Sequence, residues 1–163
     1  MMAAAVSEAM RPNTTVDAII DAARRSHLTF SARREGKHWQ ELEWRYDPNI
    51  SFLDKALEIA REKQDVFAIR APLYDLLEWG HLFSEATHTL VVALSMFVAA
   101  DGDLEKSVVG AVMYGRDKDS YASVVGALAG AFSGAKSIRN DWVETVLTAN
   151  MDPDMAVLAG QLS

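Results

Sequence analysis

Residues 115–134, GRDKDSYASVVGALAGAFSG, join a polar turn to a run of small and aliphatic residues with the composition of a helix. Within this run Gly126, Gly130 and Gly134 stand four residues apart, so they would line one face of a helix. A glycine costs about 1 kcal/mol in a helix interior relative to alanine. Three glycines on one face therefore predict that another helix backbone approaches closely there, and we expect them to serve close packing.

Apolar residues recur at helical spacing along the rest of the chain, and no segment alternates convincingly with period two. Residues 90–100 are the most apolar stretch, and about a dozen residues fall short of the roughly 20 that span a bilayer, so we expect a buried central helix. Pro72 predicts a kink or a break in the pattern at 66–77. The sequence therefore predicts an all-α fold, organised as a single helical domain over 1–163. The expected helices cover 1–10, 16–27, 53–60, 66–77, 90–100, 104–114, 121–135, 138–150 and a last short one at 155–162.

The composition limits the classes of protein to which the chain can belong. Its 163 residues are half apolar and 24% charged, which is the balance of one globular domain. Lys and Arg number 16 against 23 Asp and Glu, and the resulting formal net charge of −7 argues against nucleic-acid binding. Because cysteine is absent, disulfides, thiolate metal sites and cysteine nucleophiles are excluded. With no basic amino-terminal region before an apolar stretch, we expect a cytoplasmic protein that does not enter a membrane.

Asp117, Asp119 and Ser120 follow one another closely where the polar turn meets the expected helix. Two carboxylates and a hydroxyl are hard oxygen ligands that suit Mg²⁺, Mn²⁺ or Ca²⁺. An aspartate at a helix start can equally cap free backbone N–H groups and favour the positive end of the helix dipole. The residues alone leave both interpretations open. A calcium loop of the EF-hand type is excluded, because Leu128 stands where position 12 of a loop starting at Asp117 requires Glu.

The stretch 115–134 resembles the C-terminal signature of the ADP-ribosylglycohydrolase family. In that signature Gly-(Gly/Arg)-Asp-x-Asp-Thr is followed by Gly-Ala-(Leu/Ile)-Ala-Gly-Ala and a further Gly. Residues 115–120 match the first part, with Ser120 at the position of Thr, and residues 126–134 match the second.

Two flanking segments extend the resemblance over most of the chain. Residues 138–142 resemble the family's Ile-Pro-x-x-Trp step, with Arg139 at the usual proline. Residues 85–93, with His88 at the usual proline, and the turn at 101–103 resemble the stretch that leads into the signature.

The resemblance implies an all-α hydrolase with two Mg²⁺ ions at the base of a cleft, acting on ADP-ribosylated substrates or related ADP-ribose compounds. Such enzymes cleave the glycosidic bond between ADP-ribose and an acceptor. In the family the Asp-x-Asp-Thr residues are metal ligands, and the resemblance carries this role to Asp117, Asp119 and Ser120. Serine keeps the hydroxyl oxygen of threonine, so Ser120 can coordinate a metal through the same type of atom.

The family's other ligands come from a Gly-Asp-Ala-(Leu/Met)-Gly helix start and a Thr-Asp-Asp cluster, and neither motif occurs in this chain. Three ligands could not hold two ions. Residues 1–10 also have the composition of a helix interior without a capping residue, although an ordinary frayed first helix would have it too. We therefore expect the chain to correspond to the C-terminal part of the family's fold, inactive alone and completed by an N-terminal half or a homo-oligomer.

Three hypotheses about function remain open at this point. The chain is part of a magnesium-dependent ADP-ribosylglycohydrolase, or a non-catalytic helical scaffold or interaction protein derived from that family, or an unrelated helical module in which the motif is a coincidence. The catalytic residues and the acceptor stay unassigned, because the residues that contact the acceptor would lie largely in the other half.

Overall fold

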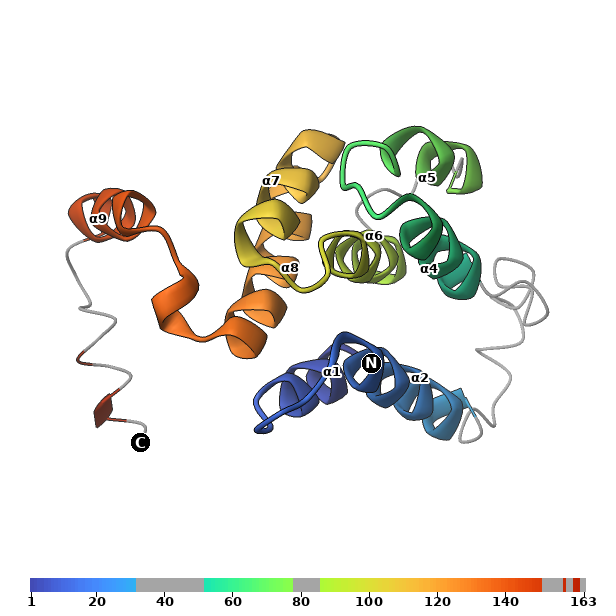
Figure 1. Ribbon diagram of the computed structural model, residues 1–163, viewed down its shortest axis with the longest axis horizontal. Helices are drawn as coiled ribbons and strands as arrows, with labels where there is room; N and C mark the ends of the chain where they lie inside the picture. Colours follow the sequence, from blue (N-terminus) through green and yellow to red (C-terminus); the bar gives the residue numbers. More distant parts are fainter. Residues whose placement is uncertain (32–51, 78–85, 151–156, 158–159, 162–163) are drawn as a thin grey trace, which may run out of the picture.

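The computed structural model describes residues 1–31, 52–77, 86–150, 157 and 160–161. These residues form eight α-helices and one 3-10 helix and include no strand, so the all-α prediction is confirmed. With the labels of Figure 1, the elements are α1 (Met2–Ala9), α2 (Val16–Ser31), α4 (Phe52–Lys63), α5 (Arg70–Leu76), α6 (Ala86–Ala99), α7 (Leu104–Tyr114), α8 (Lys118–Ser133), the 3-10 helix η2 (Ala135–Ser137) and α9 (Asn140–Ala149).

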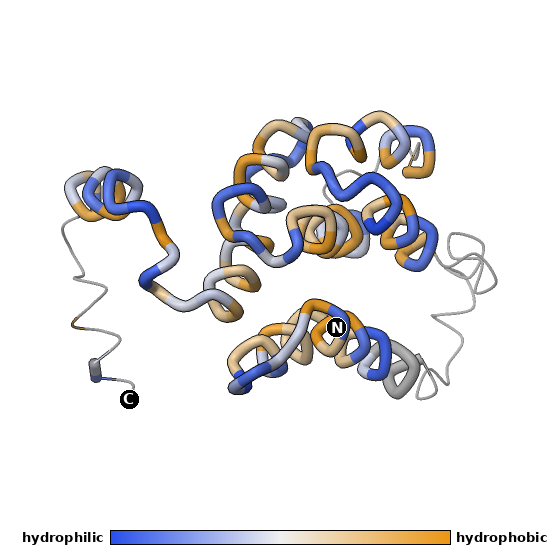
Figure 2. Tube along the Cα trace, in the orientation of Figure 1, coloured by the Kyte–Doolittle hydropathy of each residue, from blue (hydrophilic) through white to orange (hydrophobic). Residues whose placement is uncertain are grey.

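Helix α6 forms the centre of the bundle, as the apolar stretch predicts. It packs against α4, α7 and α8, and every residue from Val91 to Ala99 is buried. Figure 2 shows it as a largely hydrophobic segment in the middle of the molecule. A helix that is apolar on all sides must be covered on all sides, which is why the other helices surround α6. Among the residues that the structure describes, none of the helices has both the length and the apolar character to cross a bilayer.

Helices α1 and α2 form a hairpin that lies beneath α6 in Figure 1, and α1 also packs against α8. The side chains that face inward are small or β-branched, which lets the hairpin lie close to the bundle. Ion pairs between Arg61 and Asp17 (2.9 Å) and between Arg24 and Asp54 join α2 to α4. The buried residues of the hairpin are Ala5, Ala9, Ile19, Ile20 and Ala23.

The predicted break near Pro72 is present, and it lies before the proline. Asp65 follows the end of α4, and its Oδ1 accepts hydrogen bonds from the backbone N–H groups of Phe67 (2.7 Å) and Ala68 (3.0 Å). These two bonds hold the pKa of the Asp65 carboxyl below its usual value. Helix α5 then starts at Arg70, so Pro72 stands in its first turn. Backbone N–H groups there have no acceptor within the helix, and a residue without an N–H is tolerated.

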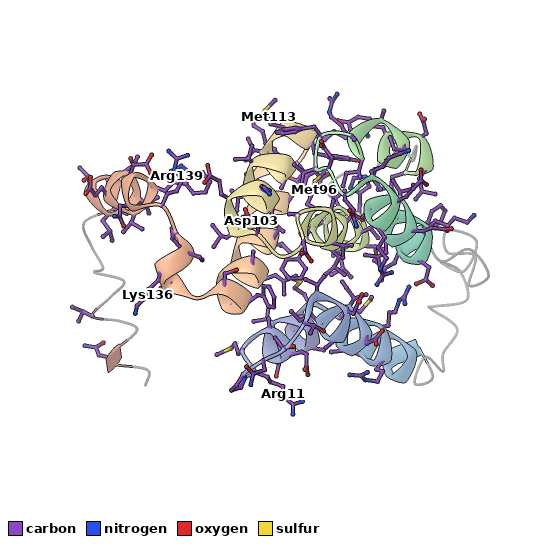
Figure 3. The ribbon with its side chains drawn as sticks, viewed as in Figure 1. Arg11, Met96, Asp103, Met113, Lys136 and Arg139 are labelled. Atoms are coloured by element: carbon purple, nitrogen blue, oxygen red, sulfur yellow. The ribbon has the colours of Figure 1, made fainter. Side chains whose placement is uncertain are left out.

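The turn at 101–103 is as predicted, and so are both ends of α7. Asp101 (φ 52°) and Gly102 (φ 77°) reverse the chain after α6. Asp103 then caps α7, because its Oδ1 accepts a hydrogen bond from the backbone N–H of Lys106 at 2.8 Å. Figure 3 labels Asp103 at the start of the helix.

The glycines of α8 do not mark a close backbone approach, which corrects the close-packing prediction. Helix α8 does pack along α7, but a Cβ added at Gly126 would lie 3.5 Å from Cγ2 of Val108. One added at Gly130 would lie 3.8 Å from Cδ1 of Leu104, and both distances are ordinary contacts with side chains. Gly134 follows the last residue of α8 with φ of 77°, and no described atom comes within 4 Å of an added Cβ. Its role is to end the helix.

The close approach occurs instead at Gly110 of α7. A Cβ added there would lie 2.6 Å from Cβ of Val66 and 3.0 Å from Sδ of Met96. Gly110 therefore lets α7 approach both the turn before α5 and the central helix, where Figure 3 labels Met96. A single glycine carries no periodic pattern, so the sequence did not single it out.

Helix α9 lies at the side of the bundle, at the left of Figure 1, and none of its residues is fully buried. Arg139 precedes it and pairs with Glu105 of α7 (2.7 Å) and with Asp141 (2.7 Å), between the two helices in Figure 3. The guanidinium also lies over the ring of Trp142, 5.4 Å from its centroid. The short helix expected at 155–162 falls mostly outside the described residues.

Candidate functional site

The three predicted metal ligands lie at the start of α8, on the turn that leads out of α7. Asp117 directly precedes the first helical residue, and Asp119 and Ser120 lie in the first turn. The helix begins three residues earlier than its apolar pattern predicts, so helical backbone positions both residues. Asp117 and Ser120 are three residues apart, which places them on the same side of the helix. Asp119 is exposed, and the other two are half-buried.

The carboxylate of Asp117 does not cap α8, although the residue occupies the capping position. Elsewhere this chain does use aspartate in this way: Asp103 caps α7, and Asp65 accepts hydrogen bonds from the turn before α5, with distances of 2.7 to 3.0 Å to backbone N–H groups. Within the part of the chain that the structure describes, neither Asp117 nor Asp119 engages its carboxylate in a hydrogen bond or ion pair. Both carboxylates are therefore free to meet a cation.

The donor set fits a hard divalent cation but is incomplete. Carboxylate and hydroxyl oxygens are the ligands that Mg²⁺ takes, so Asp117, Asp119 and Ser120 suit it in kind. Over residues 1–31, 52–77 and 86–150 and the few described beyond them, no three His, Cys, Asp or Glu side chains gather closely enough to hold a metal ion. Further ligands would have to come from elsewhere.

The turn that leads to Asp117 is held in place by α5. The carbonyl oxygen of Tyr114 accepts a hydrogen bond from the hydroxyl of Tyr74 at 2.7 Å and another from Nε of Arg70 at 3.2 Å. Two residues later Arg116 adopts φ of 55°. This left-handed conformation costs an L-residue roughly 1 kcal/mol or more. The contacts from α5 set the direction in which the chain enters α8, and therefore the position of Asp117.

A buried cluster of Tyr114, Tyr121 and His88 supports the same turn on its inner side, toward α6. The hydroxyl of Tyr121 shares a hydrogen bond of 3.0 Å with Nδ1 of His88, and the ring of Tyr114 meets that of Tyr121 edge-on at 5.6 Å between centroids. Burial raises the pKa of Tyr121 to about 12, and the nearby charge of Asp117 adds to the effect. The phenol is therefore neutral over the physiological range and remains a hydrogen-bonding group.

Sequence reasoning missed most of these supporting residues. His88 stood out only because it replaces a proline, and nothing in its neighbours indicated a contact with Tyr121. Arg70 and Tyr74 precede Tyr114 by 44 and 40 residues, so no local pattern connected them with the motif. Arg116 lies within the stretch 115–134, but that stretch gave only a weak indication of its role.

A cavity of about 700 Å³ lies apart from the candidate ligands. It is lined by residues at the start of α2, in the turn between α4 and α5, and at the turn that joins α6 to α7, among them Asp65, Phe67 and Lys106. None of Asp117, Asp119 and Ser120 lines it. The cavity and the candidate site are therefore separate.

Of the comparisons with known proteins, the one with family models supports the resemblance to the family. No curated protein and no solved structure matches the chain. The family model for ADP-ribosylglycohydrolase matches residues 1–163, a range that contains the candidate ligands and every helix that the structure describes. The chain therefore belongs to the ADP-ribosylglycohydrolase family.

Proposed function

We propose that this chain supplies the Asp-x-Asp-Ser ligands of a magnesium-dependent hydrolase that cleaves the glycosidic bond between ADP-ribose and an acceptor. Family membership supports the type of hydrolase. One observation carries the ligand assignment: Asp117 stands at the capping position of α8 without capping it, while Asp103 caps α7. Because it makes no capping hydrogen bond, the carboxylate of Asp117 keeps its oxygens available to a cation.

The three candidate ligands would contribute by holding the metal in a fixed position. Carboxylate oxygens of Asp117 and Asp119 and the hydroxyl of Ser120 would hold Mg²⁺, which prefers oxygen ligands. When bound, the metal supplies positive charge that stabilises the transition state, orients the ribose hydroxyls and lowers the pKa of water. The hydrogen bonds from α5 to the carbonyl of Tyr114 keep the turn, and with it Asp117, in one position.

We also propose that the remaining ligands come from a second polypeptide segment. The Gly-Asp-Ala-(Leu/Met)-Gly and Thr-Asp-Asp motifs are absent from this sequence, and two ions need more than the three ligands found here. A polypeptide with both motifs would complete the site in the cytoplasm, and this chain alone would be inactive.

Magnesium binding tests the ligand assignment directly. Isothermal titration of the full chain, alone and with a polypeptide that carries both missing motifs, should detect Mg²⁺ binding that the double variant Asp117→Asn, Asp119→Asn abolishes. The control is Asp101→Asn, which removes a carboxylate at φ of 52°, where asparagine is well tolerated. Unchanged Mg²⁺ affinity in the double variant, with its helical circular dichroism retained, would overturn the assignment.

Hydrolysis tests the proposed activity. Release of ADP-ribose from ADP-ribosylated arginine is expected from the mixture of the two polypeptides with Mg²⁺ and not from this chain alone. If the mixture binds Mg²⁺ and releases nothing from any ADP-ribosylated substrate offered, the hydrolase proposal is wrong for this polypeptide.

A non-catalytic interaction protein derived from the family is the second candidate function. The observation in its favour is the face of α9, where Val143, Val146 and Leu147 are exposed and no residue is fully buried. Apolar side chains that gather on an exposed face are typical of contact surfaces. If the mixture of the two polypeptides neither binds Mg²⁺ nor releases ADP-ribose, this candidate is favoured.

A further inference from the structure

Two arginines from different parts of the chain gather around one tyrosine next to the candidate ligands. The guanidinium carbon of Arg70 lies 4.9 Å from the centroid of the Tyr74 ring, and that of Arg116 lies 4.7 Å from the same centroid. Tyr74 is itself anchored, because its hydroxyl donates to the carbonyl of Tyr114. Arg116 directly precedes Asp117, so the cluster borders the proposed metal site.

Neither arginine of this cluster pairs with an acid. Across the residues that the structure describes, Arg70 and Arg116 form no ion pair with a carboxylate, and both side chains are exposed. The chain has 23 acidic against 16 basic residues, so carboxylates are plentiful. Other arginines in the described ranges do find them, namely Arg11, Arg24, Arg61 and Arg139.

The arrangement holds two like charges together at a cost. Both guanidinium carbons contact the ring of Tyr74. They are therefore within roughly one Debye length of each other, about 10 Å, so salt does not fully screen their repulsion. Arg116 also occupies a left-handed backbone conformation that glycine would adopt without strain. Cation–π contacts with Tyr74 offset part of this cost. An anion that contacts both guanidinium groups would reduce their repulsion further.

We propose that Arg70, Tyr74 and Arg116 form an anion site for the diphosphate group of a nucleotide. Arginine suits phosphate oxygens because its planar guanidinium donates two parallel hydrogen bonds. Arg70 uses Nε for the Tyr114 carbonyl, which leaves its terminal nitrogens for a ligand. The choice of a nucleotide diphosphate rests on the proposed function, since ADP-ribose carries that group beside its ribose. The cluster would then hold the phosphates while the ribose lies toward Asp117.

Binding of ADP without metal tests the site separately from the magnesium ligands. Isothermal titration of the full chain in a chelator should detect ADP and inorganic pyrophosphate, and it should detect no comparable binding of adenosine, which lacks phosphate. Arg116→Ala should weaken ADP binding by roughly tenfold or more, the usual effect of losing a hydrogen bond to a charged group. Arg116→Lys keeps the charge and loses the paired donors, so its affinity should fall between those of the wild type and Arg116→Ala.

The matched control is Arg11→Ala, which removes one positive charge from an exposed arginine in the turn between α1 and α2, far from the α7–α8 turn near Met113 in Figure 3. It should bind ADP like the wild type. The proposal is overturned if the folded wild type binds no ADP, if adenosine binds as well as ADP, or if Arg116→Ala and Arg11→Ala have the same affinity.

The double variant Asp117→Asn, Asp119→Asn separates this proposal from the proposed function. It should lose Mg²⁺ binding and keep ADP binding in chelator. If it keeps ADP binding while neither it nor the wild type binds Mg²⁺, the anion site stands and the metal assignment fails. If Mg²⁺ binding behaves as expected and ADP binding is insensitive to Arg116→Ala, the anion site fails alone.

Discussion

The hydroxyl of Tyr121 lies 3.0 Å from Nδ1 of His88, so a buried hydrogen bond joins the start of α8 to the central helix. Tyr121 directly follows Ser120, the last of the candidate ligands. Because His88 belongs to the most buried helix of the bundle, the bond ties the start of α8, where the ligands lie, to the core. The core thus determines where the candidate site lies.

Tyr121→Phe removes the phenolic hydroxyl, and with it the hydrogen bond to His88, while keeping the buried ring. We expect the free energy of unfolding to fall by about 1 to 3 kcal/mol, because a buried partner loses a bond that water does not replace. Urea denaturation measures the change. Ser123→Ala, at an exposed position on the same helix, is the control. It should change stability by less than about 0.5 kcal/mol. Equal stabilities for Tyr121→Phe and the wild type would show that the bond contributes nothing.

Gly110→Ala and Gly130→Ala should have opposite effects. At Gly110 the new methyl would lie 2.6 Å from Cβ of Val66. We therefore expect a loss of stability of about 1 to 3 kcal/mol from overpacking. At Gly130 the nearest atom would lie 3.8 Å away. The better helix propensity of alanine should therefore add up to about 1 kcal/mol there. Melting temperatures of the two variants decide this, and a destabilised Gly130→Ala would restore the close-packing interpretation of α8.

The two capping positions should respond differently to alanine. Asp103→Ala removes the hydrogen bond to the N–H of Lys106. It should destabilise the chain by about 1 kcal/mol. Asp117→Ala removes no such bond. It should cost less than about 0.5 kcal/mol when measured in a chelator. Chemical denaturation of both variants provides the test, and equal losses would mean that Asp117 caps α8 in solution.

Asp65 should make stability depend on pH in the acid range. Its folded-state pKa is lowered by the backbone N–H groups of Ala68 and Phe67, so its ionised form favours the folded chain. The stabilisation is fully present above the unfolded pKa of about 3.9 and is lost as the pH falls through the lower folded value. The difference in unfolding free energy between the wild type and Asp65→Asn should therefore shrink below about pH 4. A difference that stays constant from neutral to strongly acidic pH would contradict this.

Local patterns in the sequence predicted the helices well. The uninterrupted apolar run identified α6 as the central helix. The turn at 101–103 and the polar turn that starts at Gly115 gave both ends of α7, because turn signals depend on residues close together in the chain. Pro72 indicated a break but not its position, since a proline is accepted in a first helical turn.

Contacts between distant segments could not be predicted in this way. The spacing of Gly126 and Gly130 suggested a close approach between helices, which the structure has at Gly110 instead. Whether a helix position has room for a Cβ depends on which side chains the neighbouring helix places against it. At the candidate site, the motif indicated Asp117, Asp119 and Ser120, but not the support that their turn receives from α5.

The two donors to the Tyr114 carbonyl come from Arg70 and Tyr74, which precede it by 44 and 40 residues. Closing so long a segment of chain costs entropy, which the contacts of the folded chain must offset. A chain in which α7 and α8 have already formed would carry every candidate ligand and still lack their alignment. Alignment of the site therefore depends on the docking of α5 against the α7–α8 turn, so a change that loosens α5 should disturb the ligands without touching them.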